Sequence, residues 1–257
     1  MRIVLRLVGL SLALVGAARP AGAVDGAALY QAYWAGLPAG EVRLQLHDDA
    51  NAYRDEIEIR TEGLPALLTR FSATATSEGR LAAILPMPQR YDARYALRKN
   101  RHKRLVMQFE ARGSGVVADR GPGDTSDKPP LPARFRTNVF DPLSALTAIR
   151  DALRHGNHER FSVPVYDGAR RFDVIAQVLP PQPGDKELHL RLTLAPIAGF
   201  KGATSDEGDP DDAPRPATLT MTGDERLMPL SFRVSLAYLP LVIELRRWCG
   251  SPSACRW

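Results

Sequence analysis

A cluster of cations is the densest charged feature of the chain and the feature best suited to binding chemistry. Five positive side chains fall within seven residues: Arg98, Lys99, Arg101, Lys103 and Arg104. They lie between two alternating segments, 91–97 and 105–109, so they form the tip of a predicted hairpin. Charge can simply keep such a tip soluble. It can also bind lipid headgroups, lipopolysaccharide or another acidic envelope polymer, at roughly 1 kcal/mol per cation.

Residues for catalysis or metal binding do not occur in a recognisable spacing. Ser114 lies between two glycines but lacks the Gly-x-Ser-x-Gly pattern of a nucleophile elbow. Gly156 separates His155 from His158 and is expected to end a helix, so the two rings need not share a face. The acidic run at 206–212 lacks the ligand spacing of a helix–loop–helix calcium site. We predict no catalytic residue, metal or cofactor, although a distant serine and histidine could still meet in the fold.

The two cysteines, Cys249 and Cys255, are close together near the end of the chain. Their spacing is not that of a CxxC redox motif. Zinc typically needs four ligands, and no histidine follows His189. The sequence therefore predicts a structural disulfide, formed in an oxidising compartment, that holds the C-terminal tail.

The N-terminus has the features of a secretory signal peptide. Arg2 and Arg6 precede an apolar run at 7–18, and small residues occupy 21–23. The run is about a dozen residues, whereas a bilayer-spanning helix needs roughly 20. We predict a signal peptide over 1–23, cleaved after Ala23, and a periplasmic mature protein that does not span the membrane.

Composition favours one globular domain over 24–257. Apolar residues make up 44% and charged residues 25% of the chain, as in proteins with a true core. Removing Arg2, Arg6 and Arg19 with the signal lowers the formal net charge from +5 to about +2. A net charge this small gives no support to binding of nucleic acid by the chain as a whole.

Apolar and polar residues alternate along most of the chain. Val42, Leu44 and Leu46 show the pattern, which returns at 161–165 and 188–194. Strands buried on one face only are typical of antiparallel sheets. Asp167 and Gly168 form a hairpin signal between two such runs. Segments 113–132 and 199–216 are predicted to be exposed loops, and Pro240 to mark a break between the last two strands.

One segment has the spacing of a helix instead. Asp141 can cap it, and Pro142 suits its first turn. Apolar residues then recur on one face, at Leu143, Leu146, Ile149 and Leu153. Gly156 fits the C-terminal cap. We predict a helix near 141–155 that packs on the sheet.

Large aromatic residues gather early and late in the chain: Tyr30, Tyr33, Trp34, Tyr238 and Trp248. They can fill a β core. Alternatively, a curved sheet can leave a cavity beside them for an apolar ligand.

Four short segments, in this order, resemble an exported bacterial family known as domain of unknown function 3108. They are Tyr33, Trp34, Ala35 and Gly36 with Gly40; Phe140, Asp141, Pro142, Leu143 and Ser144 leading into Arg150; Val165, Tyr166, Asp167 and Gly168; and Arg226, Leu227, Met228, Pro229 and Leu230. The resemblance implies a periplasmic, antiparallel and strongly curved sheet, either a sandwich or a half-open barrel. It implies no activity and no catalytic residues. The acidic loop near Asp206 is longer than the family suggests.

Three hypotheses follow for the function. The first is a non-catalytic periplasmic protein that binds or chaperones a cell-envelope component, a lipid or a glycan. The second is an assembly factor that binds an envelope protein through its sheet edges. The third is an unrecognised hydrolase.

Overall fold

The computed structural model describes most of the chain after the predicted signal peptide. The described residues are 25–49, 51–63, 66, 71–82, 85–97, 101–110, 116–120, 131–157, 159–181, 183–200, 213–236, 239–249 and 255. The predicted signal peptide, its cleavage site and the acidic run at 206–212 lie outside them.

Seven strands form the first half of the fold as a simple meander. They are β1 (Asp25–Trp34), β2 (Leu37–Asp48), β3 (Ala52–Thr61), β4 (Phe71–Leu81), β5 (Pro86–Leu97), β6 (Arg101–Phe109) and β7 (Val116–Arg120). Each pairs antiparallel with the next. β7 lies within a segment predicted to be a loop, and that prediction is wrong there. Its pairing with β6 outweighs the weak strand signal of its own residues.

A short 3-10 turn, η2 (Ala133–Phe135), and one helix, α2 (Ser144–Arg154), connect the two halves. The carboxylate of Asp141 accepts hydrogen bonds from the backbone N–H groups of Leu143 and Ser144, at 2.9 and 2.8 Å. Asp141 therefore caps the first turn as predicted, although the helix begins at Ser144. Gly156 ends the helix with a positive φ of 80°.

Six strands form the second half. They are β8 (Arg160–Tyr166), β9 (Arg171–Val178), β10 (Glu187–Ala198), β11 (Arg215–Thr222), β12 (Pro229–Leu236) and β13 (Leu239–Trp248). The Asp167–Gly168 turn joins β8 to β9 as predicted, and Gly168 has φ 90°. Pro240 lies inside β13 and not in a break between strands. Its carbonyl accepts a hydrogen bond from Ala35.

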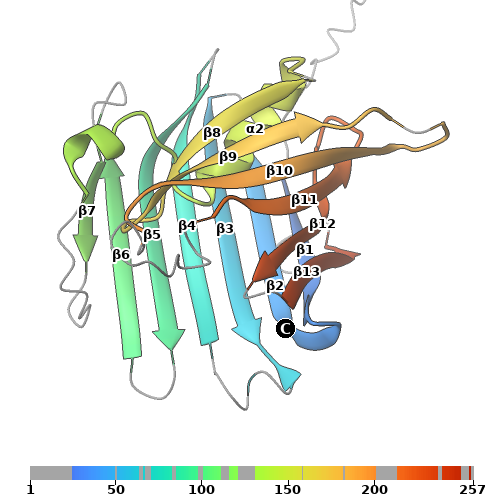
Figure 1. The fold of residues 1–257 in the computed structure, drawn as a ribbon, viewed down its shortest axis with the longest axis horizontal. Helices are drawn as coiled ribbons and strands as arrows, with labels where there is room; N and C mark the ends of the chain where they lie inside the picture. Colours follow the sequence, from blue (N-terminus) through green and yellow to red (C-terminus); the bar gives the residue numbers. More distant parts are fainter. Residues whose placement is uncertain are drawn as a thin grey trace, which may run out of the picture.

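All thirteen described strands belong to one antiparallel sheet. Their order is β7-β6-β5-β4-β3-β2-β1-β13-β12-β11-β10-β9-β8. The first and last strands are therefore neighbours in the middle of the sheet. In Figure 1 the strands β8–β11 cross over the strands of the first half, and α2 lies between the two parts. Among the described residues β7 and β8 do not pair, so the sheet curls without closing. The predicted class, a curved antiparallel sheet with one packed helix, is confirmed.

The core consists of two apolar clusters on the inner face of this sheet. One joins the strands of the first half to Leu143, Tyr166 and Met228. The other packs the helical residues Ile149 and Leu153 on strands β8–β12. Of the apolar residues predicted for the helix face, Ile149 and Leu153 are therefore buried against the second half of the sheet. Leu143 is buried against the first half, and Leu146 packs on both clusters.

Candidate functional site

The helix α2 is buried on its polar side as well as on its apolar side. Ser144, Thr147 and Arg150 are all fully buried. A buried charge is costly unless it is paired, so these residues must find partners on the strands they face. The sequence pattern showed only the apolar stripe.

Arg150 reaches β2 to find its partner. One guanidinium nitrogen, Nη2, lies 2.9 Å from the Asp48 carboxylate, and both side chains have no exposed surface. Arg154 contacts the same carboxylate at 3.2 Å. Arg150 also donates to the backbone carbonyl of Arg226 at 3.2–3.3 Å. One side chain thus joins the helix to both halves of the sheet.

Two further carboxyls complete this buried network. Asp55 on β3 accepts a short hydrogen bond from Thr147, and Asp141 accepts one of 2.9 Å from Ser77 on β4. Burial raises the pKa of Asp55 to about 7, although the Thr147 hydrogen bond and the Arg150 charge oppose this rise. Burial also raises the pKa of Asp141, against the hydrogen bonds from Ser144. A neutral carboxyl is favoured wherever desolvation exceeds the stabilisation of the charge.

The network joins the helix to strands of the first half of the sheet. Asp48, Asp55 and Asp141 are at most 2% exposed, so a substrate cannot reach them. The network's described side chains are carboxyls, hydroxyls and the guanidinium groups of Arg150 and Arg154, and no histidine is among them to serve as a general base. A nucleophilic hydrolase therefore gains no support from it.

A cleft of about 520 Å³ opens beside α2, where the two halves of the sheet approach each other. Ala148 and Ala152 of the helix belong to its lining, and we call these two residues its floor. The other lining residues come from the start of β5, the end of β6, the 138–140 segment, the turn after the helix and β8: Leu85, Pro86, Met87, Pro88, Phe109, Glu110, Asn138, Val139, Phe140, Asn157, Phe161, Ser162, Val163 and Pro164. The volume lies within the usual range of about 300–1,000 Å³ for small-molecule sites.

Residue size and residue polarity explain the character of this cleft. The two alanines are four residues apart on one helix face, and their short side chains leave space above the floor. Phe109, Phe140 and Phe161 make the walls apolar, while Glu110 and Asn157 bring polar groups to the lining. Such a shape accommodates an apolar chain better than a charged ligand.

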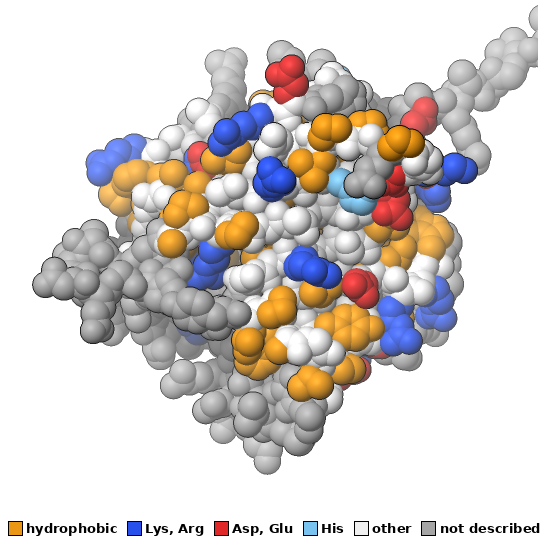
Figure 2. All heavy atoms as spheres, turned by 45° about the vertical axis from the view of Figure 1, so that its right-hand side comes forward, with side chains coloured by type: hydrophobic (Ala, Val, Ile, Leu, Met, Phe, Trp, Pro, Cys, Tyr) orange, Lys and Arg blue, Asp and Glu red, His pale blue; other side chains and the backbone are white. Residues whose placement is uncertain are grey.

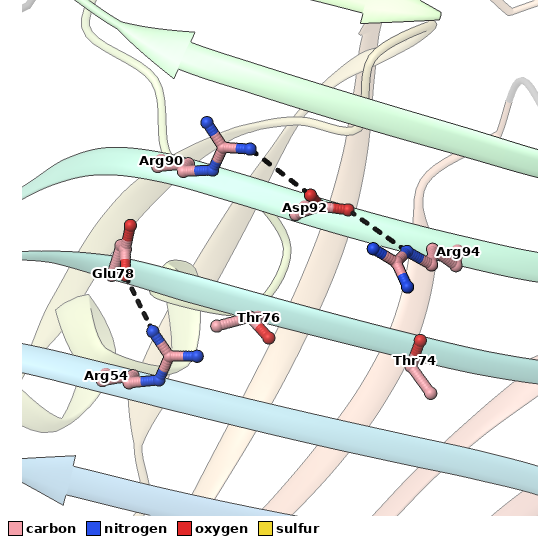
Figure 3. A pocket seen from close by; sticks show the side chains of 7 residues that line it. All are labelled: Arg54, Thr74, Thr76, Glu78, Arg90, Asp92 and Arg94. Carbon is pink, nitrogen blue, oxygen red and sulfur yellow. Dashed lines mark hydrogen bonds and ion pairs between the residues drawn. The ribbon is translucent and has the colours of Figure 1, made fainter. Parts of the chain in front are cut away.

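A second hollow, about 280 Å³, lies among polar side chains on strands β3–β5. Figure 3 shows Thr74, Thr76 and Glu78 along β4, with Arg54 of β3 on one side and Arg90, Asp92 and Arg94 of β5 on the other. Arg54 pairs with Glu78 at 2.9 Å, and Arg90 pairs with Asp92 at 3.4 Å. The charges are largely compensated, as on the wetted face of an antiparallel sheet.

Asp185, Glu187 and His189 form a third cluster, which the sequence pattern did not indicate. Their ligand atoms lie within 4.8 Å of one another near the start of β10. The His189 ring already hydrogen-bonds to Asp185 at 2.7 Å, and both acids are exposed. The arrangement is an ordinary surface histidine–aspartate pair.

Comparison with known proteins identifies the family. A family model described as "Protein of unknown function (DUF3108)" matches residues 29–180, more than half of the chain. The chain belongs to the DUF3108 family. The resemblance found in the sequence is thereby confirmed.

The fold of this DUF3108 protein is similar to that of another uncharacterised protein. The crystal structure of a beta-barrel-like protein of domain of unknown function DUF1849, from Brucella abortus, matches with a TM-score of 0.55. The match covers 88% of this chain and 97% of that chain at 11% identity, so it concerns the fold alone. No curated protein matches the chain.

The cationic hairpin predicted from the sequence is described only in part. Arg98 and Lys99 lie outside the described residues, and Arg101 is described only as part of β6. Arg104 pairs with Asp92 at 2.6 Å, and its hydrogen bonds lower the pKa of that carboxyl. Lys103 and Arg104 line a further hollow, of about 390 Å³, at the base of the hairpin.

The cysteines of this DUF3108 protein form the disulfide Cys249–Cys255, with a Cα–Cα distance of 5.4 Å. Cys249 follows β13, and its N–H donates to the carbonyl of Ala27 in β1. The bridge therefore secures the chain next to the central strand pair. Among the described residues no helix is long and apolar enough to cross a membrane.

Four of the aromatic residues expected to border a cavity are described, Tyr30, Tyr33, Trp34 and Trp248, and none of these four lines the cleft. Tyr30 is buried in the core, with its hydroxyl donating to the Pro229 carbonyl at 3.0 Å. Trp248 packs over Gly26, where a Cβ atom would lie 2.3 Å from its ring. Trp34 is exposed, and Tyr238 lies outside the described residues. A cleft exists, but other residues form it.

Proposed function

We propose that this DUF3108 protein is a non-catalytic binding protein of the periplasm, and that its cleft holds the acyl chain of an envelope lipid. The observation that carries this proposal is the 520 Å³ cleft with a small-residue floor and three phenylalanines in its walls. The predicted signal peptide and the disulfide support an oxidising location outside the cytoplasm.

The size of the apolar contribution supports an acyl chain as the ligand. Each buried methylene contributes about 0.8 kcal/mol, so about ten of them contribute about 8 kcal/mol. Ordering the chain reduces this value. Micromolar or weaker affinity is therefore expected, because about 8 kcal/mol corresponds to a Kd of about 1 μM.

The polar groups of the lining suit the headgroup of a lipid whose acyl chain occupies the cleft. Glu110, Asn138 and Asn157 are exposed, and the amide groups can donate hydrogen bonds to oxygen atoms of a headgroup. A glycan would need more polar partners than this cleft offers.

A fluorescent fatty acid tests the proposal directly. The mature protein is titrated with cis-parinaric acid, and saturable binding is expected. Ala152→Phe would fill the space above the floor and weaken binding by at least tenfold. Ala133→Phe, at an exposed position in η2 away from the cleft lining, is the matched control and should bind as the wild type does.

The two variants also give the result that would overturn the proposal. Equal binding by the Ala152→Phe variant and the wild type, with both folded by circular dichroism, would exclude the cleft as the acyl site. Native mass spectrometry of the protein purified from the periplasm identifies the natural ligand. A co-purifying lipid supports the proposal, whereas a stoichiometric polypeptide favours the assembly-factor hypothesis.

A further inference from the structure

Three large apolar side chains are exposed at neighbouring hairpin tips. Trp34, Leu37 and Leu239 are 37%, 51% and 42% exposed. Trp34 and Leu37 face each other across the β1–β2 turn. The N–H of Ala35 donates to the carbonyl of Pro240 at 2.9 Å, so the β1–β2 and β12–β13 hairpins lie side by side. We call Trp34, Leu37 and Leu239 the apolar tips.

The cationic hairpin lies at the same end of the strands as the apolar tips. We refer to this row of strand ends as an edge of the sheet. In a continuous antiparallel order, the β1–β2, β5–β6 and β12–β13 connections must all leave the sheet at one edge. Figure 1 shows the β1–β2 and β5–β6 hairpins at its lower end. In Figure 2 hydrophobic side chains are spread over the face, and one group of them near its lower end lies beside both basic and acidic side chains.

The hollow at the base of the β5–β6 hairpin suits a phosphate group. Its lining includes three cations, Arg94, Lys103 and Arg104, and the hydroxyl-bearing Ser72 and Thr74. Two of the cations, Arg94 and Arg104, also contact the carboxylate of Asp92, at 3.9 and 2.6 Å, so a bound phosphate would share them with this acid. Guanidinium, ammonium and hydroxyl groups are the donors that phosphate oxygens accept most readily. Its volume is about 390 Å³.

We propose that this edge of the sheet docks on a bilayer surface that contains anionic phospholipid. The apolar tips enter the interfacial region, where tryptophan and leucine are favoured. The hollow takes the phosphate of an anionic headgroup.

The distance between the two features favours a bilayer over a single small ligand. The apolar tips and the hollow are separated by about four strands, hence about 20 Å along the sheet. A lipid surface can contact both at once. Apolar insertion combined with cation–phosphate attraction is the composition expected of a peripheral membrane surface.

This docking edge is distinct from the acyl cleft. The cleft is lined by the first residues of β5 and the last residues of β6, which lie at the opposite edge of the sheet. The inference therefore does not depend on the proposed acyl binding, and each can fail without the other.

Vesicle co-sedimentation of the mature protein tests the docking edge. The vesicles consist of phosphatidylcholine alone or of phosphatidylcholine with phosphatidylglycerol. Binding is expected only to the anionic vesicles, and it should weaken as ionic strength rises.

Matched variants separate the two edges of the sheet. Leu37→Ser with Leu239→Ser removes two apolar tips, and binding should weaken at least tenfold. Leu85→Ser with Met87→Ser changes two side chains of the cleft lining that are 51% and 40% exposed, so it should weaken parinaric acid binding and leave vesicle binding unchanged. Arg94→Gln with Lys103→Gln should weaken binding by about fivefold per cation. Arg134→Gln with Arg160→Gln is the matched control, because it changes two exposed arginines outside the hollow. This variant should bind the vesicles as the wild type does.

Three results would overturn the proposal. They are absence of binding to anionic vesicles at low salt, equal binding to neutral vesicles, and loss of binding in the Leu85→Ser/Met87→Ser control but not in the tip variant. Circular dichroism establishes that each variant is folded. Parinaric acid binding reports the state of the cleft independently of the vesicles.

Discussion

Replacing Asp55 by asparagine should change how the stability of this protein depends on pH. Asp55 has no exposed surface, and burial raises its pKa from an ordinary value near 4 to about 7. The folded protein therefore retains a proton that the unfolded chain releases between pH 4 and pH 7. Raising the pH across this range favours the unfolded chain, so the wild type loses stability as the pH rises.

The size of the effect follows from the shift in pKa. A difference of about three pKa units corresponds to about 4 kcal/mol, at 1.36 kcal/mol per unit. The stabilisation from the neutral carboxyl is complete below pH 4 and lost above pH 7. The amide side chain of the Asp55→Asn variant would be neutral at every pH and could still accept the hydrogen bond of Thr147, so the variant should lack this component.

Denaturation with urea at several pH values between 4 and 8, with the disulfide intact, measures the difference. The free energy of unfolding of the variant minus that of the wild type should rise by about 4 kcal/mol from pH 4 to pH 8. Asp141 also has a raised pKa, but it is present in both proteins and largely cancels in the difference. Asp49→Asn is the control. Backbone hydrogen bonds lower the pKa of this exposed carboxyl, so its effect should appear only below pH 4. A difference that stays constant across the pH range would refute the assignment of a neutral, buried Asp55.

Two further predictions concern the buried ion pair and the disulfide. Arg150→Met should lower the free energy of unfolding by about 3 kcal/mol, because it leaves Asp48 buried with Arg154 as its remaining ionic partner. Adding Asp48→Leu should recover more than half of this loss in chemical denaturation, and a single variant as stable as the wild type would contradict the argument. Cys249→Ser should cost about 2 kcal/mol, because the bridge closes a short loop with a sequence separation of 6. Thermal unfolding with and without reductant measures the effect, and reduction should then no longer destabilise the variant.

The strands and the helix could be predicted from the sequence because each leaves a local signal. Val42, Leu44 and Leu46 mark a strand by alternation, and Gly156 marks the helix end because it adopts a positive φ. The strand β7 could not be predicted, because its pairing with β6 decides its conformation and its own residues do not.

The site could not be predicted because it depends on contacts between distant segments. From the sequence, the polar face of α2 has the composition of a solvent-exposed face, because threonine and arginine, the types of Thr147 and Arg150, are common on helix surfaces. Their partners, Asp55 and Asp48, are about a hundred residues earlier in the chain. The cleft likewise joins the helix floor to β5, β6 and β8. One signal was available in the sequence: an arginine on the helix together with aspartates at the ends of two alternating runs.

The pairing of β1 with β13 means that the sheet can be completed only when the last segment of the chain has arrived. Ala28 pairs with Trp248, about 220 residues later. In a chain that lacked β13, β1 would be an unpaired edge strand, whose free backbone N–H and C=O groups could pair with other molecules. During synthesis or transport from the N-terminus, the strands β1–β7 therefore remain without β13 until the end of the chain has emerged. Truncated chains should aggregate more readily than complete ones.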